Sequence, residues 1–102
     1  MTEVRRQHER YEIELPVVVV AAGDEISGVT INVSLGGMLL RLSKPMTFGA
    51  SLVLRVQLPS ARESSDMDAV VRWVKDDGTI GVQFTSLRAR DTWALNQLLK
   101  SK

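Results

Sequence analysis

Apolar and polar residues alternate over residues 11–21 of this chain in a way that predicts a β-strand. Tyr11, Ile13 and Leu15 alternate with glutamates, and four consecutive valines follow. Because successive side chains of a strand point to opposite faces, this segment would have one apolar face. Pro16 has no backbone N–H to donate, so we expect the strand to bend there or to lie at a sheet edge.

Five further segments have the composition and spacing of strands. Gly23 and Asp24 separate the first two strands, and both residues suit a tight turn with positive φ or Asx geometry. In the second strand, the apolar side is expected to hold Val29, Ile31 and Val33. The five segments are residues 25–32, 38–42, 52–58, 66–75 and 79–84.

The period of the apolar residues changes near the C-terminus. Leu95, Leu98 and Leu99 have the spacing of one helix face, which predicts a C-terminal helix. Six short strands and one amphipathic helix predict a mainly β fold, a six-stranded antiparallel β-barrel with the helix over an open end or a seam. The chain would form a single domain, divided into a flexible arginine arm at residues 1–10, the barrel at 11–85 and the helix at 88–101.

The composition narrows the chemistry that this domain could perform. The 102 residues have a net charge of +1, so a site for an anion would have to be local. The chain has no cysteine and a single histidine, His8, which argues against disulfides, metal sites and Ser-His-Asp or Cys-His catalysis. We therefore expect no enzymatic activity and no metal or cofactor. Without an apolar signal segment or a long apolar run, the chain is expected to be cytoplasmic and not inserted in a membrane.

Two short motifs carry the functional prediction. Arg6 and Arg10 form R-x-x-x-R directly before the first strand, and Asn32, Ser34 and Gly37 form N-x-S-x-x-G after the second. If these two strands form a hairpin, the residues before Tyr11 lie near those after Ile31. The two motifs would then share one surface site.

The residue types of the two motifs suit one class of ligand. Arginine offers paired donors that match phosphate oxygens or the O6/N7 edge of guanine. The amide of Asn32 can pair with a base edge, and the hydroxyl of Ser34 can donate to phosphate or to a base. Gly36 and Gly37 would allow close approach and positive φ. These features predict an anionic, planar ligand such as a guanine nucleotide.

The motifs resemble those of the PilZ domain family, bacterial receptors for the second messenger cyclic di-GMP. The similarity extends to "RRQHERYEIELPV", "TINVSLGGMLL", "VVRWVKDDGTIGVQF" and the closing "RDTWALNQLL", in the order of the family. It implies a six-stranded barrel with a C-terminal helix. It also implies that Arg6 and Arg10 grip phosphate and guanine, while Asn32, Ser34 and Gly37 shape the opposite side of the pocket.

The residue before the first motif bears on stoichiometry. Arg5 stands directly before Arg6, and in the family an arginine there accompanies the binding of two stacked nucleotide molecules. One or two molecules of cyclic di-GMP are therefore expected, with two favoured.

Each of these residues also has a purely structural interpretation. The three arginines could form a solvated N-terminal arm, with His8 as an exposed spacer. Asn32 and Ser34 could be turn residues, and Gly36 and Gly37 turn or bulge glycines. Trp73 is expected in the core. Near a barrel rim it could instead stack on a base, so it is also a candidate ligand-binding residue. Trp93, on the helix, is expected to serve packing and not function.

The function that these observations favour is a cyclic di-GMP receptor or adaptor. In this hypothesis the arginine arm closes over the nucleotide and alters a docking surface for an unidentified effector protein. The alternative is an adaptor of the same fold that binds no nucleotide. A nucleic-acid partner is disfavoured because five aromatic residues and a net charge of +1 do not make a basic, aromatic groove.

Overall fold

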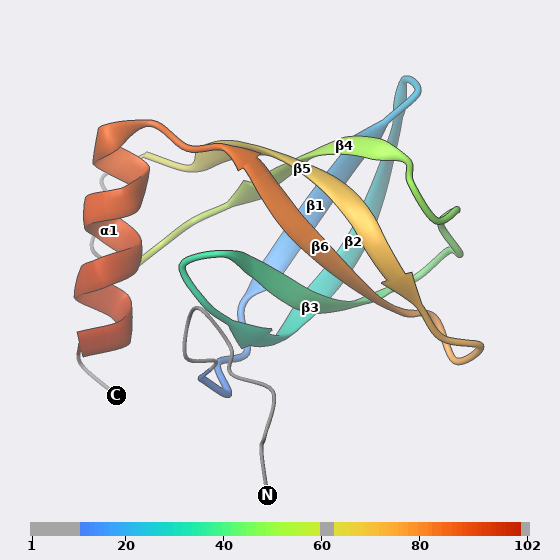
Figure 1. The fold of residues 1–102 in the computed structure, drawn as a ribbon, viewed down its shortest axis with the longest axis horizontal. Helices are drawn as coiled ribbons and strands as arrows, with labels where there is room; N and C mark the ends of the chain where they lie inside the picture. The colour runs from blue at the N-terminus through green and yellow to red at the C-terminus, as the bar shows by residue number, and fades with distance from the viewer. Residues whose placement is uncertain (1–10, 60–62, 101–102) are drawn as a thin grey trace, which may run out of the picture.

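The computed structural model describes residues 11–59 and 63–100, and in these ranges the chain forms six strands and one helix. The strands close into an antiparallel barrel in the order β1-β2-β3-β6-β5-β4 (Figure 1). This confirms the predicted fold class. The elements are β1 (Pro16–Ala21), β2 (Asp24–Val33), β3 (Gly37–Leu42), β4 (Ser51–Val56), β5 (Ser65–Val74), β6 (Thr79–Ser86) and α1 (Ala89–Lys100).

The first strand begins later than the sequence predicts. Residues 12–15 lie outside the strands, and β1 starts at Pro16. Since β1 pairs with β2 on one side and β4 on the other, it is not an edge strand, which excludes one of the two alternatives expected for Pro16. Proline is tolerated here because it is the first residue of the strand, where a missing N–H costs least.

Two tight turns connect neighbouring strands. Ala22 and Gly23 have φ of 51° and 83°, as in a two-residue hairpin turn, so positive φ falls one residue earlier than predicted and Asp24 already belongs to β2. Between β5 and β6, Gly78 has φ of 89°. There Thr79 donates to the Asp77 carboxylate through its hydroxyl and its backbone N–H, the latter at 3.0 Å, which lowers the pKa of Asp77 below its ordinary 3.8.

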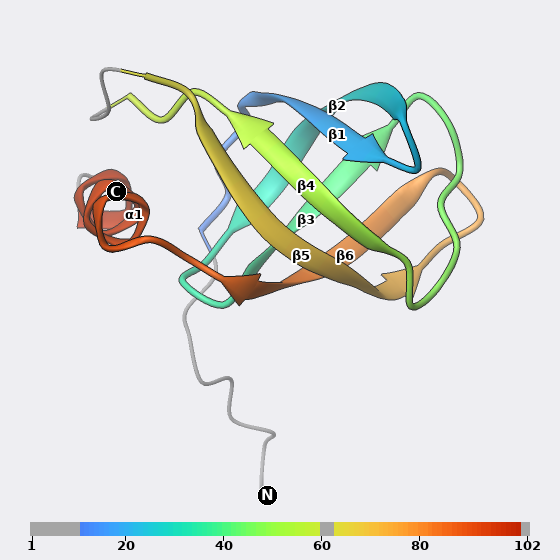
Figure 2. The same cartoon turned by 90° about the horizontal axis from the view of Figure 1, so that it is seen from above.

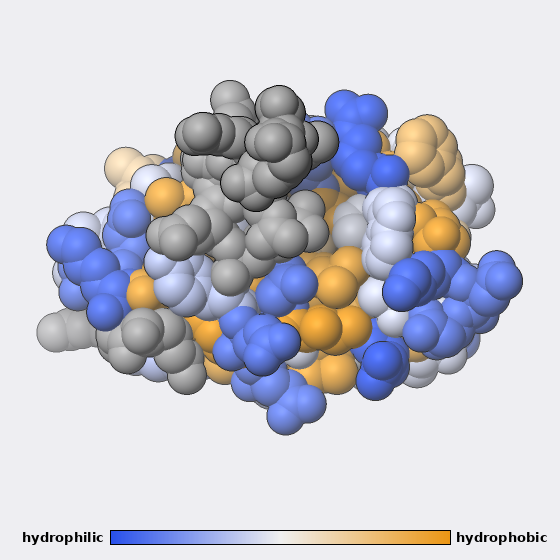
Figure 3. All heavy atoms as spheres, turned by 60° about the horizontal axis from the view of Figure 1, so that its bottom comes forward, coloured by the Kyte–Doolittle hydropathy of each residue, from blue (hydrophilic) through white to orange (hydrophobic). Residues whose placement is uncertain are grey.

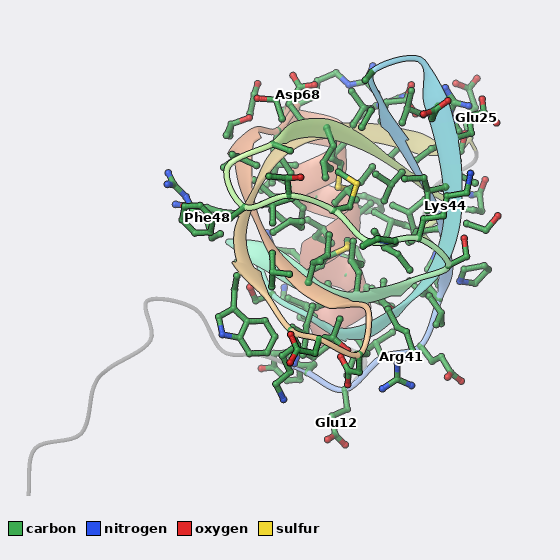
Figure 4. All side chains as sticks on the ribbon, turned by 90° about the vertical axis from the view of Figure 1, so that its right-hand side faces the viewer. Glu12, Glu25, Arg41, Lys44, Phe48 and Asp68 are labelled. Atoms are coloured by element: carbon green, nitrogen blue, oxygen red, sulfur yellow. The ribbon has the colours of Figure 1, made fainter. Side chains whose placement is uncertain are left out.

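The barrel interior is filled by apolar side chains, while charged ones such as Glu12, Glu25, Arg41, Lys44 and Asp68 point outward (Figure 4). The prediction for the apolar side of β2 was right for Val33, which is buried, and wrong for Val29 and Ile31, which are only half-buried. The other inward residues of β2 are Ile26 and Thr30. The residues that line the interior include Val17, Val19, Leu40, Leu54, Met67, Val71, Ile80 and Val82.

The helix α1 lies beside one end of the barrel, and Figure 2 shows it end-on. Leu95, Leu98 and Leu99 are buried in the same apolar cluster as the barrel interior, as predicted. Trp93 is 56% exposed, because it lies about 160° around the helix from Leu95. Among the described residues no helix is long and apolar enough to cross a membrane.

Candidate functional site

The N-x-S-x-x-G motif forms the turn between β2 and β3, and Ser34 organises it. The Ser34 hydroxyl accepts hydrogen bonds from the N–H groups of Gly36 and Gly37, both at 3.1 Å, and donates to the Gly37 carbonyl at 3.2 Å. Its backbone N–H donates to the same carbonyl at 2.9 Å. These bonds use the one hydrogen and both acceptor positions of the hydroxyl. Ser34 is therefore a turn residue, and a direct contact with a ligand would have to replace one of these bonds.

The two glycines of this turn both lie against β6, Gly37 by close packing and Gly36 through a backbone hydrogen bond. A Cβ at Gly37 would lie 2.0 Å from the carbonyl oxygen of Val82 in β6, so only glycine fits there. The carbonyl of Gly36 accepts from the N–H of Phe84 at 2.9 Å. The expectation of positive φ was wrong for both, since neither is among the described glycines with positive φ. The backbone that comes close to Gly37 is therefore that of β6, whereas the sequence predicted the close approach of a ligand.

A β-bulge in β2 turns Asn32 to the outside of the barrel. Thr30 pairs with Leu40 and Asn32 pairs with Leu39, so Ile31 is an extra residue in the ladder. Without this bulge, Asn32 would face inward like Thr30. Within residues 11–59 and 63–100, no side chain or backbone group is hydrogen-bonded to the Asn32 amide.

A second bulge, in β5, turns Trp73 outward. Val71 pairs with Val82 and Trp73 with Gly81, which leaves Arg72 as the extra residue. Trp73 is 42% exposed, so the expectation of a core tryptophan was wrong and its possible stacking role remains a prediction. The ring lies over Gly81, where a Cβ would be 3.6 Å from its Cε3 atom, and the Lys75 Nζ is 5.2 Å from the ring centroid.

The two bulges place Asn32 and Trp73 in one transverse row on the outer surface. Asn32 pairs with Leu39, Leu39 with Gly81, and Gly81 with Trp73, across β2, β3, β6 and β5. With a strand spacing of about 4.8 Å, the row spans roughly 14 Å. Hydrophobic surface lies exposed among hydrophilic residues on the face shown in Figure 3. We call Asn32, Leu39, Gly81 and Trp73 the outer row.

The guanidinium of Arg72 lies beside the outer row, and the sequence did not single it out as a site residue. The Arg72 Nε donates to the Gln83 side chain at 2.9 Å, and Gln83 pairs with Gly37 of the motif turn. Leu39 and Gly81 were missed as well. An isolated glycine within a strand is a signal for close approach of another group, and here that group is the indole of Trp73.

The R-x-x-x-R motif lies outside the described residues, and so do Arg5, Arg6, His8 and Arg10 individually. The structure does show where the chain goes directly after Arg10. Tyr11 and Val33 exchange two backbone hydrogen bonds of 2.9 Å, and Val33 stands between Asn32 and Ser34. The residue next to Arg10 in sequence is therefore paired with the second position of the N-x-S-x-x-G motif.

The described residues offer no metal centre. Within residues 11–59 and 63–100, no three His, Cys, Asp or Glu side chains are grouped so that they could hold a metal ion.

Comparisons with known proteins give one family. The PilZ domain model matches residues 4–101. The cellulose synthase catalytic subunit of Xanthomonas axonopodis pv. citri is 30% identical over 86 residues, which are 83% of this chain but only 12% of that protein.

Solved structures agree on the fold. The inhibitor of motility of Bacillus subtilis (MotI/DgrA) has a TM-score of 0.79 and 26% identity, covering 97% of this chain and 52% of that one. The PilZ domain of YcgR from Escherichia coli, solved with c-di-GMP, has a TM-score of 0.77 at 15% identity, covering 96% and 91%. The PilZ domain of CeSA, from a cellulose-synthesizing bacterium, has a TM-score of 0.69 at 18% identity, covering 91% and 96%. At these last two identities the similarity shows the fold alone.

Proposed function

Because this chain belongs to the PilZ domain family, we propose that it is a receptor or adaptor module for cyclic di-GMP. The observation that carries the proposal is the pairing of Tyr11 with Val33. It joins the residue next to Arg10 to Val33, which stands between Asn32 and Ser34 of the N-x-S-x-x-G motif, so side chains from both motifs can reach one ligand. The YcgR domain of the same fold was solved with this nucleotide.

The outer row supplies a surface that suits the chemistry of this nucleotide. Cyclic di-GMP has two anionic phosphates and two guanines with acceptor-rich edges. In our proposal Arg6 and Arg10 bind phosphate and guanine through paired donors, and the Asn32 amide binds a base edge. Trp73 offers a flat face for stacking. Ser34 and Gly37 contribute by holding the turn.

The receptor acts by binding and not by catalysis. Closure of the arginine segment over the nucleotide changes the surface around the outer row, and an effector protein reads that change. Such a response requires that the nucleotide bind the closed arrangement more tightly than the open one. The relatives named above concern motility and cellulose synthesis, and this chain spans 52% and 12% of their lengths, so the effector itself is left unidentified.

Isothermal titration calorimetry with cyclic di-GMP tests the proposal. We expect micromolar or tighter binding, about −8 kcal/mol or better. Cyclic di-AMP lacks the guanine O6 acceptor and should bind far more weakly. Arg6→Ala and Arg10→Ala should each weaken binding by about tenfold or more, since charge-assisted hydrogen bonds contribute about 1.5–3 kcal/mol. If the nucleotide does not bind, the chain is a nucleotide-independent adaptor of the same fold.

The same titration measures stoichiometry. We propose two stacked molecules per chain, because Arg5 adds a third guanidinium next to the motif. Arg5→Ala should then lower the stoichiometry from two to one and leave a single molecule bound. A stoichiometry of one in the unaltered chain would remove this role from Arg5.

A further inference from the structure

Thr30 is a polar residue on the inner face of β2 whose hydroxyl is directed to the chain before β1. It is 1% exposed and pairs with the buried Leu40 of β3. Its hydroxyl accepts a hydrogen bond from the N–H of Leu15 at 2.8 Å and donates one to the carbonyl of Ile13. Its own N–H donates to the Leu15 carbonyl at 2.8 Å.

Residues 11–15, which we call the strap, lack a regular ladder. The strap is fixed to β2 at one end by Tyr11 and Val33 and at the other by Leu15 and Thr30. Five strap residues lie against only four residues of β2, so regular antiparallel pairing cannot continue through it. In a regular ladder, the N–H of Leu15 and the carbonyl of Ile13 would form hydrogen bonds with backbone groups of β2. Here both form them with the Thr30 hydroxyl. It therefore acts as a side-chain substitute for ladder bonds.

The hydroxyl also fixes where the strap lies along β2. A slip of one residue would move the strap by about 3.3 Å and reverse the faces of its side chains. Ile13, now buried, would turn outward, and the bonds to Thr30 would be lost. Because Arg10 is attached to Tyr11, the last residue of the arginine motif would move by the same distance. Paired guanidinium–phosphate hydrogen bonds do not tolerate such a displacement.

We propose that Thr30 is a positioning residue for nucleotide binding. It touches no ligand, and it acts by setting the register of the strap, from which Arg6 and Arg10 extend. This inference rests on the proposed cyclic di-GMP function. It adds a residue outside both motifs, on the inner face of the barrel, whose loss weakens binding through the arginines.

The test compares Thr30→Val with Thr30→Ser. Valine keeps the shape but removes both hydroxyl bonds, whereas serine keeps them. For Thr30→Val we expect the Kd for cyclic di-GMP to rise about tenfold or more, and hydrogen exchange at the Leu15 amide to become faster. For Thr30→Ser both quantities should stay within about threefold of the unaltered chain. If Thr30→Val does not fold, Thr30→Cys, with a weakly bonding thiol of similar size, should give the same changes to a smaller degree.

Two controls separate positioning from a general loss of stability. Thr79→Val removes another buried threonine hydroxyl, one that bonds to Asp77 and not to the strap, and should leave the Kd unchanged. In a background that carries both Arg6→Ala and Arg10→Ala, Thr30→Val should cost about twofold or less, because the groups that it positions are already gone. An equal penalty in both backgrounds would overturn the proposal.

The exchange measurement keeps this inference distinct from the proposed function. If the unaltered chain binds no cyclic di-GMP, the proposed function fails. Unchanged Leu15 exchange in Thr30→Val would instead show that the hydroxyl does not set the strap. Faster exchange with an unchanged Kd would show that the strap does not position the arginines.

Discussion

Gly37 and Gly81 both lie in strands that carry the outer row and its turn, but the space around their α-carbons differs. At Gly37 an added Cβ would meet a backbone oxygen at 2.0 Å, and backbone cannot move away without shifting β3 against β6. At Gly81 the nearest atom is the Trp73 Cβ at 3.3 Å, a separation that a movement of a few tenths of an ångström would relieve.

We therefore expect Gly37→Ala to lower the free energy of unfolding by about 2–3 kcal/mol, as overpacking does in a well-filled site. Gly81→Ala should cost less than about 1 kcal/mol, since Trp73 needs to move by only a few tenths of an ångström. Chemical denaturation of both variants measures the difference. Equal losses would show that the contact between Gly37 and Val82 is not what requires glycine.

Asn32 and Ser34 belong to one motif, but their bonding separates their roles. Ser34→Ala removes three hydrogen bonds from the turn and should lower stability by about 1–2 kcal/mol. Asn32→Ala removes an amide with no bond to another described residue, so stability should stay within about 0.5 kcal/mol. Asn32→Ala should instead weaken cyclic di-GMP binding, by about three- to tenfold. Thermal unfolding and calorimetry on both variants test this division, and a large stability loss in Asn32→Ala would contradict it.

Strand elements were predictable here where the alternation is regular, and less so where a bulge interrupts it. In β4 the apolar positions Leu52, Leu54 and Val56 are all buried, as their spacing predicts. In β2 a two-residue period that includes the buried Val33 would also place Ile31 and Val29 inward, whereas the structure buries Thr30.

The cause is a change of phase inside the strand. A bulge adds one residue and so exchanges the inner and outer faces beyond it. Nothing in the residue types of β2 announces the bulge, because Ile31 has the same preference for extended backbone as its neighbours. The outward position of Trp73 escaped prediction for the same reason. The two motifs were recognisable from sequence, but the outer row that accompanies them depends on both bulges.

The bulge in β5 leads to an optical prediction. The chain has two tryptophans, Trp73 on the outer row and Trp93 on the exposed side of α1. If cyclic di-GMP stacks on the outer row, it should quench the emission of Trp73 alone. Trp93→Phe should keep the quenching and Trp73→Phe should lose it. Trp73→Ala should also weaken binding, by about 1–3 kcal/mol for a stacked base. Quenching that persists in Trp73→Phe would place the nucleotide elsewhere.

The barrel as a unit gives the site its rigidity, and its closure follows from the pairing of β1 with both β2 and β4. A closed barrel has no free edge, so the outer row is displayed on strands that are held on both sides. The sequence supports this architecture through six strand segments and a family resemblance, while strand order and closure come from contacts distant in sequence. Charge is the property of the molecule that composition does fix, at a net +1.

That net charge makes the salt dependence of binding informative. A molecule with a charge of +1 attracts an anion weakly at long range, so any strong salt effect must come from local arginines. Between 50 and 500 mM salt we expect cyclic di-GMP affinity to fall about three- to tenfold, because screening weakens the phosphate contacts.

Two variants with the same net charge locate the origin of this salt effect. Arg10→Gln and Arg55→Gln each lower the charge from +1 to 0, since one positive charge is removed from the same chain. Arg55 lies on β4, outside the outer row, and pairs with Asp66 at 3.2 Å and Glu25 at 3.6 Å. Only Arg10→Gln should flatten the dependence of affinity on salt. If both variants flatten it equally, the attraction arises from overall charge, and the phosphate-binding role of the first motif would have to be abandoned.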